Sequence, residues 1–147
     1  MLDEREQQSV FDEIRLMKES PHPLIVKIID DFLDYGGHQC IVQDFFSEGD
    51  FSKFLSERSD KKFEEEEILR FLANIIMTVS HINSRDIYHR DLKPGNFLIK
   101  TERNGRVYLY LNDFGIAKKM KPDYTRLTSS AGVVKGTVEY LPPEILV

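Results

Sequence analysis

The sequence predicts a mixed α+β domain, and three patterns carry that prediction. Apolar residues recur at helical spacing between 64 and 83. Short β-rich segments flank Tyr35-Gly36-Gly37, and a second pair flanks Asn104-Gly105. Glycine turns between short apolar segments are typical of hairpins. With 147 residues, the chain has the length of one domain or of part of one.

Before residue 64 the sequence predicts a helix, a hairpin and a second short helix. Apolar residues at helical spacing indicate the first helix, and Pro21 and Pro23 end it. The expected elements are a helix over 3–19, strands over 24–32 and 38–44, a connector over 45–50 and a brief helix over 51–55.

The clearest helical pattern covers residues 64–83. Acidic residues open it, where they complement the helix dipole, so we interpret them as a helix start and not as a ligand site. The expected apolar face consists of Ile68, Phe71, Leu72, Ile75, Ile76 and Val79. Segments 97–99 and 107–111 predict a second hairpin, and 116–142 is expected to be loop-like.

Composition limits the class of protein. Hydrophobic residues make up 41% and charged residues 31% of the sequence, which is typical of a globular domain. A net charge of −5 argues against a nucleic-acid or anionic-membrane surface. The sequence has no signal-peptide pattern and no membrane-length apolar segment, and its single Cys40 excludes an internal disulfide. We therefore expect an intracellular protein, cytoplasmic or nuclear, with neither nucleic acid nor membrane as a partner.

The most informative feature is a pair of polar motifs. Residues 89–96 read His-Arg-Asp-Leu-Lys-Pro-Gly-Asn, and Asp113-Phe114-Gly115 follows 22 positions after Asp91. The five characteristic residues of the first motif would match by chance in about 5 of 10⁵ chains of this length. Such groups suit phosphoryl transfer, which needs a proton acceptor for a hydroxyl, oxygen ligands for magnesium and a cation for the moving charge.

This order of elements, together with these motifs, resembles the central part of a eukaryotic protein kinase domain of the serine/threonine type. The resemblance covers residues 1–147 and implies a two-lobed kinase-like fold that is incomplete. It implies a small-lobe remnant over about 1–44, a hinge over 45–50, and over 51–147 the part of the large lobe with the catalytic and activation loops. ATP and Mg²⁺ are the implied cofactors, and a protein serine or threonine is the implied substrate.

The resemblance also implies catalytic roles for four side chains. Asp91 would orient the substrate hydroxyl and accept its proton, and Lys93 would stabilise charge on the transferring group. Asn96 and Asp113 would hold magnesium. The position of Lys93, two residues after Asp91, implies serine/threonine specificity.

The same resemblance implies how a nucleotide would bind. Gln43 would guard the adenine pocket, and backbone groups of Asp44 and Phe46 would bond the base. Asp50 is expected to reach the ribose, and Leu98 to lie under the adenine.

Several further residues would organise the site. Glu13 corresponds to the ion-pairing glutamate of the family's regulatory helix. Phe114 and Gly115 complete the second motif. His89 and Phe114 would join Met17 and Ile28 in an apolar column between the lobes. We interpret His89 as a packed, orienting residue and not as a base.

Regulation by phosphorylation is implied by Arg90, which would pair with a phosphate on the activation loop. The position three residues before Gly136, often the phosphorylated one, is Val133 in this chain. Thr128, Ser129 and Ser130 are therefore the candidate sites for an upstream activating kinase.

The end of the sequence resembles the substrate-docking loop and its anchor. Gly136 and Thr137 would belong to the loop, and Glu144 in Pro-Pro-Glu would be the anchor.

Some family elements have no counterpart in this sequence, namely the glycine-rich phosphate loop, the strand with its lysine and the later helices of the large lobe. We expect the chain alone to be a weak or inactive kinase, with the apolar face of 68–79 exposed. The alternative is a non-catalytic kinase-derived binding or regulatory module. A small-molecule phosphotransferase fits less well, because it gives no reason for Lys93 or for the Gly-Thr and Pro-Pro-Glu segments.

Overall fold

The computed structural model describes residues 4–58, 62–119 and 136–143. In chain order, its elements are α1 (Glu4–Glu19), β1 (Ile28–Leu33), β2 (Gln39–Gln43), α2 (Phe51–Glu57), α3 (Glu65–Asn83), β3 (Ile87–Tyr88), the 3₁₀ turn η1 (Pro94–Asn96), β4 (Phe97–Thr101), β5 (Val107–Leu111), β6 (Lys118–Lys119) and η2 (Val138–Tyr140). Helices occur together with three two-stranded sheets, so the predicted α+β class is confirmed.

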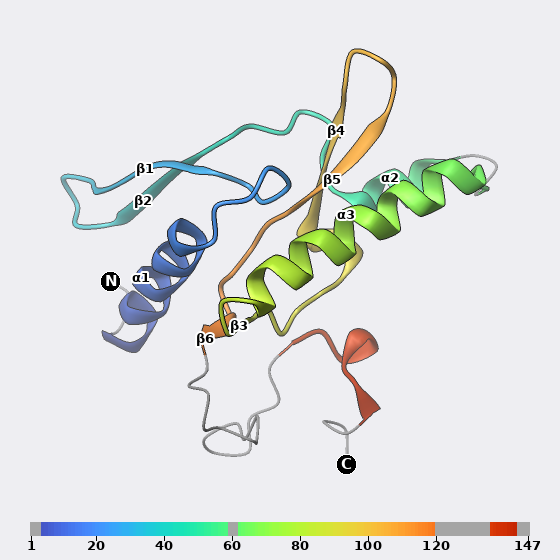
Figure 1. Ribbon diagram of the computed structural model, residues 1–147. Helices are drawn as coiled ribbons and strands as arrows, with labels where there is room; N and C mark the ends of the chain where they lie inside the picture. Colours follow the sequence, from blue (N-terminus) through green and yellow to red (C-terminus); the bar gives the residue numbers. More distant parts are fainter. Residues whose placement is uncertain (1–3, 59–61, 120–135, 144–147) are drawn as a thin grey trace.

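The elements form two groups. Figure 1 shows α1 and the β1–β2 hairpin on one side of the molecule, and α2, α3 and the β4–β5 hairpin on the other. Both hairpins are antiparallel, as their turn residues predict. The connector after β2 reaches the second group along β4, where the Ile99 N–H donates to the Gly49 carbonyl at 2.9 Å.

The loop between α1 and β1 departs from the sequence prediction, since the first strand begins at Ile28 and not at residue 24. Leu24 and Val26 pair with the end of β5. The Leu111 N–H donates to the Leu24 carbonyl at 2.8 Å, and the Val26 N–H donates to the Leu111 carbonyl at 2.9 Å. This pairing joins the two groups immediately before Asp113.

The buried apolar core draws on both groups. Its residues are Leu16, Met17, Ile25, Val26, Phe71, Ile82, Ile87, Phe97, Ile99, Leu109, Leu111 and Phe114. One of them, Phe114, belongs to the second polar motif, so packing of the core also fixes that part of the candidate site.

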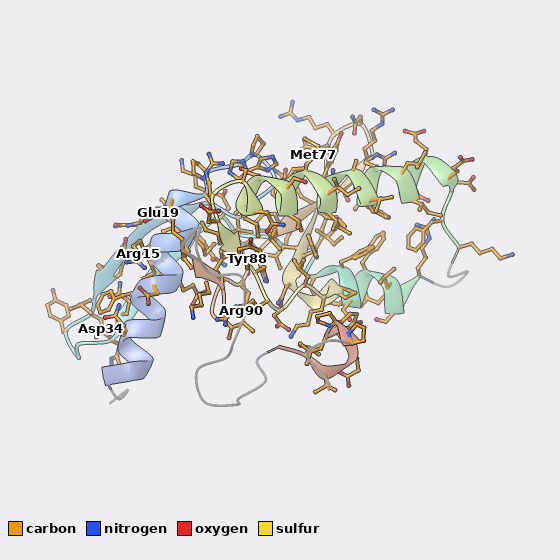
Figure 2. The ribbon with its side chains drawn as sticks, turned by 60° about the horizontal axis from the view of Figure 1, so that its bottom comes forward. Arg15, Glu19, Asp34, Met77, Tyr88 and Arg90 are labelled. Atoms are coloured by element: carbon orange, nitrogen blue, oxygen red, sulfur yellow. The ribbon has the colours of Figure 1, made fainter. Side chains whose placement is uncertain are left out.

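α3 buries only part of its predicted apolar face. Phe71 of this face is buried, and Ile75 and Val79 are half-buried. Ile82, which was not predicted as part of the face, is also buried. The other members of the predicted face, Ile68, Leu72 and Ile76, remain 50–54% exposed. Leu69 and Met77, which were not predicted as part of it, are exposed to a similar degree. Figure 2 shows Met77 on the side of α3 that faces away from the other elements. Among the described residues, no helix has both the length and the apolar character needed to cross a membrane.

The segment expected to be loop-like contains two short elements, β6 and η2. In β6, Lys118 pairs with Tyr88 and Lys119 pairs with Ile87 of β3. Strands of two residues are too short to leave a periodic pattern, and their pairing depends on a partner far away in the chain.

The buried side chain of Asn74 in α3 leads to a prediction about the stability of the fold. The Asn74 side chain accepts a hydrogen bond from the Leu109 N–H of β5 at 2.9 Å, inside the core. We expect Asn74→Ala to lower the free energy of unfolding by about 2 kcal/mol, because the Leu109 N–H loses its partner. Asn83→Ala, at an exposed position of the same helix, is the control and should cost less than about 0.5 kcal/mol. Urea unfolding of both variants tests this, and equal losses would contradict it.

Candidate active site

The first polar motif follows β3 in a turn held by His89. The His89 ring is buried, its Nε2 lies 3.1 Å from the Asn112 carbonyl, and its centroid lies 5.2 Å from that of Phe114. A contact with a carbonyl requires Nε2 to carry the proton. Burial lowers the pKa of His89, so the ring is a neutral, packed group. The contacts show a packed ring, and its orienting role stays a prediction.

Polar groups of four residues meet at Asp91. Its Oδ1 accepts hydrogen bonds from the Thr137 N–H at 2.8 Å and from the Thr137 hydroxyl at 2.7 Å. Its Oδ2 lies 2.8 Å from the Lys93 Nζ and accepts from the Asn96 Nδ2 at 3.1 Å. The Lys93 Nζ also donates to the Thr137 hydroxyl at 2.7 Å. A carboxylate, an ammonium group and a hydroxyl therefore lie within hydrogen-bond distance of one another.

These contacts set the charge of the site. Burial alone would raise the pKa of Asp91, but hydrogen bonds from Lys93, Thr137 and Asn96 lower it to about 2. The hydrogen bond with Asp91 raises the pKa of Lys93. The pair is therefore ionised at neutral pH. The pKa of Asp91 is lower in the folded chain than in the unfolded chain. The ionised carboxylate therefore stabilises the fold above the ordinary Asp pKa of about 4, and this stabilisation is lost as the pH falls through about 2.

A glycine brings Thr137 to Asp91. Gly136 has φ +118°, and a Cβ at this position would lie 2.7 Å from the Arg90 carbonyl oxygen. Only glycine allows the chain to approach the turn so closely. The sequence predicts that Gly136 and Thr137 belong to a docking loop, and the structure adds that Thr137 reaches the carboxylate of Asp91.

The second polar motif places Asp113 beside α1. Asp113 has φ +61°, and its Oδ1 accepts from the Gly115 N–H at 3.1 Å. Glu13 of α1 lies against the backbone of Phe114. Burial and then the charge of Asp113 raise the pKa of Glu13, whereas a hydrogen bond with Phe114 lowers it. Glu13 therefore lies at the second motif, while the ion-pairing role that the resemblance implies for it stays a prediction.

The sequence-predicted nucleotide residues lie along the connector and β4. The Asp44 N–H donates to the Lys27 carbonyl at 3.3 Å, and within the described residues neither the Asp44 carbonyl nor the Phe46 N–H makes a backbone hydrogen bond. Asp50 caps α2, with its Oδ1 accepting from the Lys53 N–H at 2.9 Å, so the cap engages one of its carboxylate oxygens. Leu98 is half-buried and forms a bridge with Asp50.

Asn96 and Asp113 have the right chemistry for a magnesium ion. The Asn96 Nδ2 donates to the backbone carbonyl of Asp91 at 2.8 Å as well as to its side chain, which leaves the amide oxygen for a metal. Among the described residues, no group of three or more His, Cys, Asp or Glu side chains could hold a metal ion. One carboxylate and one amide oxygen would need phosphate oxygens and water to complete the octahedral shell of Mg²⁺, which is its usual environment in nucleotide sites.

Arg90 is turned toward the second motif. It has φ +67°, and its Nε donates to the Ile116 carbonyl at 2.6 Å. Burial lowers the pKa of the guanidinium. The predicted phosphorylation sites Thr128, Ser129 and Ser130, and the predicted anchor Glu144, lie outside the described residues.

An ion pair that sequence reasoning missed connects α1 with β6. The Lys119 Nζ lies 2.7 Å from the Glu19 Oε2, although 100 positions separate the two residues. Figure 2 shows Glu19 beside Arg15 on α1, and the Arg15 Nε lies 3.9 Å from the Glu19 Oε1. No local sequence pattern could have indicated a contact over this separation.

The role of the Thr137 hydroxyl can be measured directly. We expect Thr137→Val to raise the pKa of Asp91 above about 2, because one of the hydrogen bonds that lower it is removed while the backbone N–H remains. Thr137→Ser keeps a hydroxyl and is the matched control. Carboxyl-carbon NMR titration of Asp91 distinguishes the two variants, and an unchanged pKa in Thr137→Val would contradict the assignment.

Comparisons with known proteins agree on one family. The model of the protein kinase domain matches residues 2–147. The serine/threonine-protein kinase nekl-2 of Caenorhabditis elegans is 32% identical over 149 residues, which cover 97% of this chain and 39% of that protein. The serine/threonine-protein kinase Nek6 of Oryza sativa subsp. japonica is 31% identical, with 95% and 24% covered. The probable serine/threonine-protein kinase nek3 of Dictyostelium discoideum is 33% identical, with 97% and 12% covered. The chain spans well under half the length of these relatives.

Proposed function

Because this chain belongs to the protein kinase domain family, we propose that its Asp91 site transfers the γ-phosphoryl group of ATP to a serine or threonine hydroxyl of a protein substrate. The observation that carries the proposal is the hydroxyl of Thr137, which donates to Asp91 and accepts from Lys93. A substrate hydroxyl needs the same two partners, one for its proton and one for the charge on the phosphoryl group.

The chemistry follows from the protonation states. A carboxylate with a pKa of about 2 is a weak base at rest, so Asp91 orients the hydroxyl and accepts its proton only as the new P–O bond forms. Lys93 stays protonated beside it and stabilises negative charge on the transferring group. The incoming hydroxyl would replace that of Thr137 at Asp91.

Asn96 and Asp113 would hold Mg²⁺, which neutralises charge on the phosphates when bound. The Asp44 carbonyl and the Phe46 N–H would bond the adenine edge, with Leu98 beneath it and the ribose near Asp50. This assignment of the adenine contacts is supported because, within the described residues, neither the Asp44 carbonyl nor the Phe46 N–H makes a backbone hydrogen bond.

In this proposal, residues 1–44 form the small-lobe part, 45–50 the hinge and 51–147 the large-lobe part. Arg90 would bind the phosphate group that an upstream kinase adds to Thr128, Ser129 or Ser130. Its partly buried guanidinium donates to the Ile116 carbonyl, and no carboxylate among the described residues pairs with it, so a phosphate would supply a negative partner.

The test is transfer of labelled γ-phosphate from Mg-ATP to a generic basic protein, followed by identification of the labelled amino acid. We expect weak label on serine or threonine, in keeping with the low activity expected of this chain alone, and its loss on magnesium chelation and in Asp113→Asn. Asparagine tolerates the positive φ of position 113, so the variant removes charge with little backbone strain. No transfer above the Asp113→Asn background would refute catalysis by this chain.

A second candidate, a non-catalytic binding module, is favoured by the half-exposed apolar side chains of α3. It predicts a folded chain without label transfer. The same assay, combined with circular dichroism of the sample, separates the two candidates.

A further inference from the structure

Two histidines meet where the loop over residues 20–25 packs on the end of α3. The ring centroids of His22 and His81 are 4.8 Å apart, with an interplanar angle of 50°. Arg85 lies beside them, with its Nη1 3.4 Å from the His81 Nδ1. The candidate active site uses none of these three residues.

Both imidazoles make contacts in which one ring nitrogen must accept a hydrogen bond, which requires a neutral ring. The His22 Nδ1 accepts from the Leu24 N–H at 3.1 Å, and the His81 Nδ1 faces a guanidinium, which can only donate. An imidazolium has two donors and no acceptor, so protonation removes the acceptor in each of these contacts.

The surroundings contain positive charge and no compensating carboxylate. Burial and then Arg85 lower the pKa of His22. Burial, Arg85 and His22 lower the pKa of His81, although the Pro21 carbonyl acts in the opposite direction. His81 also lies in the last turn of α3, where the helix dipole favours a cation. Within the described part of the chain, no acidic side chain contributes to either pKa.

We propose that His22 and His81 form an acid-sensitive contact, which holds the loop over residues 20–25 on α3 while both rings are neutral and releases it when they are protonated. The loop transmits the change, because Leu24, whose N–H is bonded to His22, pairs through its carbonyl with Leu111, two residues before Asp113. The contact thus couples pH to the position of the second polar motif. This inference does not depend on the proposed phosphoryl transfer.

The sign of the pH dependence follows from the lowered pKa values. The folded chain binds fewer protons than the unfolded chain as soon as the pH falls below the ordinary histidine pKa of about 6.5. Folding is therefore fully stabilised above this value and loses stability as the pH falls toward the lowered pKa values.

A double variant that keeps the acceptors and removes the titration tests the proposal. In His22→Asn/His81→Gln, the amide oxygens can accept from the Leu24 N–H and from Arg85. Between pH 7.5 and 5.5, we expect the unfolding equilibrium constant of the unmodified chain to rise about tenfold more than that of the double variant. His89 is present in both proteins, so its own titration cancels in the comparison.

His38→Gln is the matched control, because His38 lies at the turn between β1 and β2 with Asp34 as its partner. It should retain the steep pH dependence of the unmodified chain. Ring-proton NMR of the unmodified chain gives a second readout, in which both histidines should titrate below the ordinary value. Titration of both at or above that value, or equal rises in the unmodified chain and the double variant, would overturn the proposal.

Discussion

Asp91→Asn should lower the initial rate of phosphoryl transfer by about a thousandfold, within the range typical for loss of an acid–base group. The substitution keeps the shape of the side chain but replaces one oxygen by an NH₂ group. Both Asp91 oxygens accept hydrogen bonds. The new NH₂ group would therefore face N–H or O–H donors of Thr137, Lys93 or Asn96 in either orientation of the amide. The substrate hydroxyl also loses its proton acceptor.

Nucleotide binding provides the internal check on this variant. Asp91 is not assigned to the nucleotide, so the dissociation constant for Mg-ATP should change by less than about threefold, which is below 0.7 kcal/mol. Asp86→Asn is the matched control, since Asp86 is exposed, lies five positions upstream and has a φ of +60°, which asparagine tolerates. A rate for Asp91→Asn equal to that of Asp86→Asn would refute the catalytic assignment.

Gly136→Ala should have the second large effect, because it moves the loop that carries Thr137. The new Cβ would lie 2.7 Å from the Arg90 carbonyl oxygen and 2.9 Å from the Leu141 side chain. The backbone oxygen cannot move away without disturbing the turn before Asp91. We expect transfer to fall at least about a hundredfold, since misplacement by about 1 Å can have that effect.

Gly105→Ala separates this clash from backbone strain. Gly105 also has a positive φ, +77°, but a Cβ there would meet no atom within 4 Å. Its variant therefore carries only the strain of the left-handed conformation, about 1–2 kcal/mol. Comparing transfer rates and unfolding midpoints of the two variants gives the additional loss at Gly136, where the clash is combined with the strain of a φ of +118°. If both variants lose activity equally, close approach at Gly136 is not required.

Local patterns account for the elements that could be predicted. α3 was predicted over 64–83 and occupies 65–83, because its helical repeat is long and acidic residues mark its start. The β4–β5 hairpin follows from Asn104-Gly105. The β3–β6 pair was not predicted, since each strand has two residues and the partner comes from a distant segment.

The candidate site was predictable in its residue types but not in its contacts. The spacing of Asp91, Lys93 and Asn96 predicts phosphoryl-transfer chemistry, and the three side chains do meet because they lie in one short turn. The Thr137 contact with Asp91 spans 46 positions and depends on the close approach at Gly136, which no local pattern reports. The same reason applies to the contact between His22 and His81.

The pairing of Leu24 and Val26 with Leu111 has a consequence for the order of folding. Chain segments more than eighty positions apart must meet before these hydrogen bonds can form, and closing so long a loop has a large entropic cost. The contacts of the β4–β5 hairpin with α2 and α3 are closer in sequence and can form earlier. The half with α1 would then dock as a separate cooperative unit, whose opening exposes the Val26 and Leu111 N–H groups to hydrogen exchange while the β4–β5 half remains folded.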